Sequence, residues 1–111
     1  MTPDIDRTLS ALADPTRRAV IDKLRRGPRR ASDLAESTGA SNPAMSRHLR
    51  VLRTAGLVEV CAHDDASDFR ERYYALAPAP FEQLREWIDE VEQFWGAQLA
   101  SFKAHVEKRK R

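Results

Sequence analysis

The feature that most constrains this chain is a pair of short helical segments separated by a glycine turn. The pattern predicts one helix over residues 32–38, with Ser32 or Ala31 at its start, closed by Gly39. It predicts a second helix over residues 42–55, which begins after Ser41 as the N-cap and ends at a glycine. Two short helices joined by so tight a turn form a helix-turn-helix, here residues 32–55.

The second helix has two chemically different sides. Met45, Leu49 and Leu52 recur at helical spacing and form an inner stripe. The outer side carries Asn42, Ser46, Arg47, Arg50 and Arg53. The free amides and the dipole at a helix N-terminus favour phosphate. Side chains that can donate or accept hydrogen bonds to base edges lie near that end, namely Ser41, Asn42, Ser46 and Arg47. Three further arginines either bind phosphate or are only solvated, namely Arg29, Arg30 and Arg50.

Other elements are expected on both sides of this motif. Helices are predicted over residues 3–13 and 15–26, the second capped by Asp14, followed by a short connector at residues 29–31. After the motif the period changes to that of strands, with strands at 57–63 and 69–76 around a turn at 64–68. The predicted fold is therefore mainly α with a β-hairpin wing (57–76), which is a winged helix-turn-helix.

A long final helix over residues 81–108 is expected to pair two copies of the chain. Its apolar residues fall on three- and four-residue steps: Phe81, Leu84, Ile88, Val91, Trp95 and Phe102. A helix of ~45 Å exceeds what one small domain needs, and so aromatic a stripe is too apolar to leave in water. The simplest solution is a two-fold homodimer through this helix, with the first helix and its Leu9 packed alongside.

Charge location supports nucleic acid as a partner. The 111 residues are expected to form a single domain (1–111), and their net charge of +2 is too small to indicate nucleic acid by itself. Residues 1–60 hold eleven basic and seven acidic residues, residues 61–80 hold two and four, and residues 81–111 hold six of each. The positive surplus therefore lies in the half that contains the helix-turn-helix.

Composition excludes several other classes. Cys61 is the single cysteine, so neither a disulfide framework nor a multi-cysteine zinc site is expected. No leader pattern and no long apolar run is present, which predicts a cytoplasmic protein with no membrane partner. His48, His63 and His105 are scattered and no phosphate-binding glycine loop occurs, so we expect no enzyme.

Four segments together resemble the ArsR/SmtB family of winged-helix repressors. They are Leu-Ala-Asp-Pro-Thr-Arg-Arg at 12–18, Ser-Asn-Pro-Ala-Met-Ser-Arg-His-Leu-Arg-Val-Leu at 41–52, Ala-Gly-Leu-Val at 55–58 and Arg-Tyr-Tyr-Ala-Leu at 72–76. The resemblance covers essentially the whole chain. It implies a homodimeric transcriptional repressor that binds an inverted-repeat operator in double-stranded DNA, often its own promoter.

The resemblance also implies site residues. By position, the operator-facing residues of the recognition helix are Ser41, Asn42, Ser46, Arg47 and His48, and the wing residues near DNA are Arg70 and Arg72. Family members more often carry Gln where Asn42 stands. The alternative for His48 is a packed residue within the helix. Arg17 and Arg18 are solvated, tie helices together or touch phosphate.

The metal sites of the family are not matched. The third helix carries Ser-Asp-Leu-Ala-Glu at 32–36 instead of Cys-x-Cys. In the C-terminal helix, the positions of the zinc ligands hold Asp89, Val91, Phe102 and His105, two of them apolar. The chain therefore resembles the metal-independent branch, and we expect no metal and no cofactor.

Two other functions stay open. Cys61 and His63, with Asp64 beside them, are candidates for a metal or redox sensor. The wing tip is acidic at Asp64, Asp65 and Asp68, which suits a winged-helix module that binds protein instead of DNA. The aromatic residues of the last helix and the wing either line a ligand pocket or form plain core.

Overall fold

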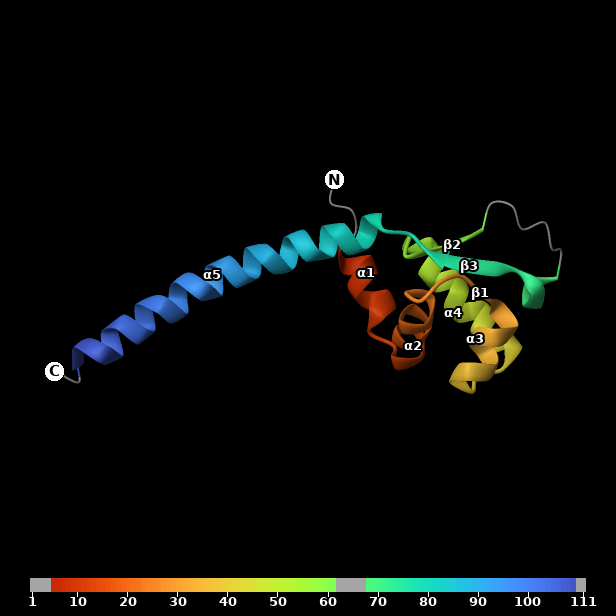
Figure 1. The fold of residues 1–111 in the computed structure, drawn as a ribbon, viewed down its shortest axis with the longest axis horizontal. Coiled ribbons are helices and arrows are strands. Elements are labelled where there is room, and N and C mark those ends of the chain that lie inside the picture. The colour runs from red at the N-terminus through yellow and green to blue at the C-terminus, as the bar shows by residue number, and fades with distance from the viewer. Residues whose placement is uncertain (1–4, 62–67, 110–111) are drawn as a thin grey trace. The chain divides into compact units, whose positions relative to one another are not determined.

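The computed structural model describes residues 5–61 and 68–109, which divide into a unit before Glu82 and a unit from Glu82 onward (Figure 1). The first unit contains α1 (Ile5–Leu12), α2 (Pro15–Leu24), β1 (Arg29–Arg30), α3 (Ala31–Thr38), α4 (Asn42–Thr54), β2 (Val58–Val60), a 3-10 helix η1 (Phe69–Glu71) and β3 (Tyr73–Leu76). The helix α5 (Ala79–Arg109) begins in the first unit, and its part from Glu82 onward forms the second unit. Among the described residues, no helix is both long enough and apolar enough to cross a membrane.

Local capping sets the helix starts. Asp14 Oδ2 accepts a hydrogen bond from Arg17 N at 3.0 Å and caps α2, and Ser41 Oγ accepts one from Ala44 N at 3.2 Å and caps α4. Gly39 ends α3 in the left-handed conformation, with φ of +76°. A side chain is strained in that conformation and glycine is not, so this turn needs glycine.

The core of the first unit lies between the helices and the sheet. The inner stripe of α4 is completely buried, as expected, and it packs with Leu34 of α3 and Val20 of α2. Tyr74 of β3 is 2% exposed and belongs to the same cluster. The opposite side of α4 is therefore the side that faces solvent.

The sheet has one strand more than the sequence predicts. Its order is β1-β3-β2, all antiparallel, with Arg29 opposite Tyr74 and Val58 opposite Leu76. The expected connector at residues 29–31 is wrong, because Arg29 and Arg30 pair with the outer edge of β3. A strand of only two residues has no alternation of its own to reveal it.

The returning strand of the wing is shorter than predicted. Residues 69–71 form the 3-10 helix η1, because Asp68 accepts a hydrogen bond from Arg70 N at 3.0 Å and Arg72 N donates to Phe69 O at 3.2 Å. The strand begins only at Tyr73. The prediction of strand over residues 69–72 is therefore wrong. The first strand is seen at Val58–Val60, and its expected end at residues 62–63 lies outside the described residues.

The remaining boundaries differ by a few residues. The helix predicted over 15–26 ends at Leu24, with Arg25 as its C-cap. The last helix begins at Ala79 instead of Phe81 and includes Pro80 in its first turn, where the missing N–H of proline costs no intrahelical hydrogen bond.

Candidate nucleic-acid interface

The N-terminal part of α4 presents a polar surface to solvent. Ser41, Asn42, Arg47 and Arg50 are exposed, and Ser46 is half-buried. Because Met45 and Leu49 anchor the other face in the core, these side chains stand on a fixed helix. A helix that starts in solvent and carries amide, hydroxyl and guanidinium groups near its N-terminus can enter a major groove of DNA.

His48 lies toward α2 instead of standing with those residues. Its Nδ1 is 3.3 Å from Arg17 Nη1 and 3.9 Å from Asp14 Oδ2, and the side chain is 21% exposed. This placement matches the packed alternative from the sequence and links α4 to the start of α2. A role of His48 in DNA binding stays a prediction.

Arg17 and Arg18 tie α1 to α2. Arg17 Nε donates to Ala11 O at 2.6 Å, and Arg18 Nη1 donates to Leu12 O and Ala13 O at 2.8 and 3.0 Å. These carbonyls belong to the end of α1, where helix carbonyls have no intrahelical partner. The two guanidinium groups therefore cap α1, as the helix-tying reading of the sequence expects.

The wing arginines differ from each other in their surroundings. Arg70 Nη2 lies 3.0 Å from Asp68 Oδ2 in an ion pair at the start of η1. The hydrogen bond from the Arg70 side chain lowers the pKa of Asp68 below its ordinary value, and the same bond raises the pKa of Arg70. Arg72 is half-buried, and its backbone O accepts a hydrogen bond from Ala31 N at 3.0 Å.

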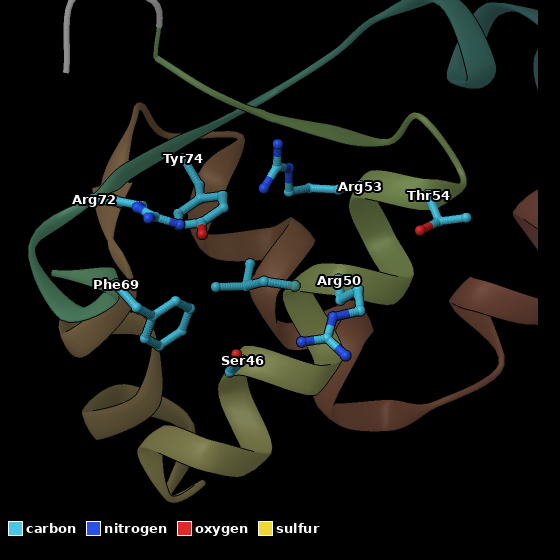
Figure 2. Close-up of a pocket in the computed structure, with 8 residues that line it drawn as sticks. Ser46, Arg50, Arg53, Thr54, Phe69, Arg72 and Tyr74 are labelled. Carbon is cyan, nitrogen blue, oxygen red and sulfur yellow. The ribbon is translucent and has the colours of Figure 1, made fainter. Parts of the chain in front are cut away.

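A pocket of about 380 Å³ separates α4 from the base of the wing (Figure 2). Arg50 and Arg72, both expected at the interface, line it together with Ser46. Sequence analysis missed that Arg53, Thr54 and Phe69 belong to the same place. The signal for Arg53 was its spacing, since it follows Ser46 and Arg50 on the outer side of the helix.

Arg30, on β1, is bound to the wing. Its Nε donates to the Tyr73 hydroxyl at 3.0 Å, its guanidinium lies 5.4 Å from the Tyr73 ring centroid, and Nη1 is 3.7 Å from Glu71 Oε2. The hydrogen bond to Tyr73 is the main cause that raises the pKa of Arg30. Arg30 therefore fastens β1 to β3.

The proposed sensor residues are only partly described. Cys61 is a half-buried free thiol whose backbone N donates to Tyr73 O at 3.0 Å. His63, Asp64 and Asp65 lie outside the described residues, so the acidic wing tip does as well, apart from Asp68. Within residues 5–61 and 68–109, no group of three or more His, Cys, Asp or Glu side chains could hold a metal ion.

The expected dimerisation residues lie on an uncovered face. No residue of α5 is buried in the described chain, and Ile88, Trp95 and Phe102 are 41%, 57% and 67% exposed. Leu84 and Val91 are half-buried, as is Phe81, which packs against the core of the first unit. Leu9 of α1 is 40% exposed. Beyond Phe81, the aromatic residues of α5 are therefore exposed among the residues that the structure describes.

Together, the helix-turn-helix and the three-stranded wing define a winged-helix DNA-binding protein. The profile of the family described as "Bacterial regulatory protein, arsR family" matches residues 14–60. The HTH-type transcriptional regulator Rv2034 of Mycobacterium tuberculosis is 40% identical over 97 residues, which is 87% of this chain and 83% of that protein.

Solved structures of other regulators superpose on this fold. The crystal structure of an ArsR family transcriptional regulator superposes with a TM-score of 0.73 and 31% identity, over 86% of this chain and 95% of that one. The homodimeric winged helix-turn-helix DNA-binding domain of a possible ArsR-family regulator from Mycobacterium bovis matches with a TM-score of 0.60 and 27% identity, over 80% and 78%.

The chain belongs to the ArsR family of transcriptional regulators. It is a DNA-binding regulator and not an enzyme, and the resemblance and the winged helix-turn-helix fold predicted from the sequence are confirmed.

Proposed function

We propose that the protein is a homodimeric repressor that binds an inverted-repeat operator, and that it does so without the metal sites of its family. The observation that carries this proposal is the capped, solvent-facing start of α4, where Ser41, Asn42 and Arg47 are exposed on a helix anchored in the core. Arg47 can bind guanine O6 and N7 with two hydrogen bonds, and Asn42 can do the same with adenine N6 and N7.

The uncovered face of α5 supports the dimer. A second copy of α5 would cover Trp95 and Phe102, and a structural relative with the same fold is described as homodimeric. Two recognition helices related by a two-fold axis read two half-sites in inverted orientation, one helical turn of DNA apart or a multiple of it. Such a dimer on a promoter blocks access of the polymerase, which is repression.

The side chains at the family's metal positions support independence from metal. Val91 and Phe102 offer no ligand atoms, and the segment that carries Cys-x-Cys in metal sensors has Ser32 and Leu34 instead. Because its ligand is DNA, we place the protein in the cytoplasm.

Binding to the DNA upstream of the protein's own gene tests the proposal. We expect a footprint with two-fold symmetry there and much weaker binding to random DNA of the same length. Affinity should fall steeply as salt concentration rises, because phosphate contacts release counterions. Operator affinity should be the same with a chelator and with added zinc.

Arg47→Ala is the diagnostic variant for this proposal. We expect it to weaken operator binding by ~1–3 kcal/mol and to relax selectivity at one base pair in each half-site. The Arg47 side chain is exposed and makes no hydrogen bond or ion pair within the described residues, so thermal stability should not change. A wild-type protein with no preference for its own promoter, or an Arg47→Ala variant with full selectivity, contradicts the proposal.

A further inference from the structure

The pocket between α4, η1 and β3 collects positive charge beside the exposed start of α4. Arg50 and Arg53 come from α4, one turn apart, and Arg72 comes from the residue before β3. Figure 2 shows the side chains of Arg53 and Arg72 entering the pocket from opposite sides, with Ser46 and Phe69 at its lower end. No carboxylate is among the lining residues.

The neighbouring acidic groups are bound elsewhere. Asp68 is paired with Arg70 at 3.0 Å, and Glu71 is paired with Arg30 at 3.7 Å. The side chains of Arg50 and Arg53 make no hydrogen bond and no ion pair with any of the described residues. Two guanidinium groups therefore face this pocket without a counter-charge from the described chain.

The walls of the pocket are fixed. Leu49 and Tyr74, which line its base, are 1% and 2% exposed and belong to the core. The backbone of Arg72 is held from two sides, since its N donates to Phe69 O at 3.2 Å and its O accepts from Ala31 N at 3.0 Å. With the surrounding backbone fixed, only the arginine side chains have to become ordered when an anion binds.

We propose that this pocket holds one phosphodiester group of the operator backbone, next to the major groove that α4 enters. A phosphodiester presents two charged oxygens, which the planar guanidinium group binds with paired hydrogen bonds, and the Ser46 hydroxyl can donate a third. The backbone is the favoured source because Ser46 and Arg50 belong both to the pocket and to the face of α4 that meets DNA. This inference rests on the proposed function.

The salt dependence of operator binding measures the contact directly. Removing one phosphate contact lowers the slope of log affinity against log salt by about 0.9, so Arg53→Gln in a dimer should lower it by about 2. We expect Arg53→Gln to weaken binding to operator and to random DNA by a similar factor, about five- to ten-fold, because a phosphate contact carries no sequence information. Arg53→Lys should restore the slope, because it restores the charge.

Arg26→Gln is the matched control. Arg26 is an exposed arginine just beyond the end of α2, outside the pocket, and its loss removes the same charge from the same unit. We expect the slope of Arg26→Gln to equal that of the wild type. Equal slopes for Arg53→Gln and Arg26→Gln, with normal thermal stability of both, overturn the phosphate contact.

A titration with inorganic phosphate distinguishes the DNA backbone from a free phosphate ligand as the occupant of the pocket. At constant ionic strength, replacing chloride by millimolar phosphate should weaken operator binding by the wild type and leave that by Arg53→Gln unaffected, because the free anion and the DNA backbone compete for one pocket. If phosphate binds the wild type but not Arg53→Gln, and leaves the wild-type operator affinity unchanged, the pocket serves a free phosphate group and the backbone proposal is wrong. If the wild type shows no preference for an operator, the proposed function fails. If the wild type prefers an operator but the salt slope of Arg53→Gln equals that of the wild type, only the pocket proposal fails.

Discussion

The Asp14 carboxylate connects the start of α2 with α4. It caps α2 through Arg17 N and lies 3.9 Å from His48 of α4. The hydrogen bond from Arg17 N is the main cause that lowers its pKa below the ordinary 3.8, and the charges of His48 and Arg17 act in the same direction. The ionised carboxylate is therefore the form that the folded chain favours.

The stabilisation by Asp14 should depend on pH. Because the folded-state pKa is lowered, its contribution is complete above the unfolded-state pKa near 3.8 and is lost as the pH falls through the lower folded-state value. We expect Asp14→Ala to reduce the urea midpoint at neutral pH and the difference from wild type to shrink in acid. Asp14→Asn keeps a capping oxygen without the charge and should lose less. A difference between wild type and Asp14→Ala that is constant with pH would contradict this role of the charge.

At this scale, sequence reasoning succeeds where the partners are close in the chain. The caps Asp14 and Ser41 were predicted because each bonds to an amide only three residues further on. The contact between His48 and Arg17 joins residues 31 positions apart. Resemblance alone placed His48 with the DNA-facing residues, since no local pattern reveals a partner on another helix.

Among the elements, the turn between α3 and α4 depends most on one residue type. Gly39 has φ of +76°, and a Cβ there would meet no atom within 4 Å. The penalty of Gly39→Ala is therefore backbone strain alone, about 1–2 kcal/mol of unfolding free energy by urea denaturation. Asparagine tolerates this conformation better, so Gly39→Asn should lose less. An unchanged stability of Gly39→Ala would show that the turn adopts another conformation.

The elements that the sequence does not predict are those that form by pairing with a distant strand or through one side-chain cap. Residues 29–30 become a strand only because the edge of β3 is available to them. Residues 69–71 alternate like a strand, but the Asp68 carboxylate bonds to the Arg70 amide and turns the chain into a 3-10 helix. The long helices were predicted well because their apolar period extends over several turns.

For the whole molecule, the face of α5 should decide the oligomeric state. Trp95→Glu places a charge in the expected interface, and we expect a mass of 12.6 kDa by sedimentation in place of twice that value. Gln93→Glu is the matched control, because it adds the same charge to an exposed position on the other side of α5. Operator affinity of Trp95→Glu should fall on the order of 100-fold, since each protomer then binds with one recognition helix. A monomeric wild type, or equal masses for both variants, contradicts the dimer.

The sequence predicts a dimer through α5 because a helical stripe of this length exposes more aromatic surface than a single domain can cover. The charge pattern assigns DNA binding to the first half of the chain on the same kind of evidence, since both are properties of long segments. The pocket beside α4 was beyond sequence reasoning, because it joins Arg53 to Phe69 and Arg72 across the fold.

The strand β1 has a consequence for the DNA. Through Arg30 and Ala31, the start of α3 is hydrogen-bonded to the base of the wing, so the helix-turn-helix and the wing base are held together as one rigid body. When the groove width of an operator does not match the fixed spacing between the recognition helix and the wing base, the double helix has to bend or its groove has to narrow. Operators with easily deformed base steps at the positions that no side chain touches should therefore bind more tightly than stiff ones.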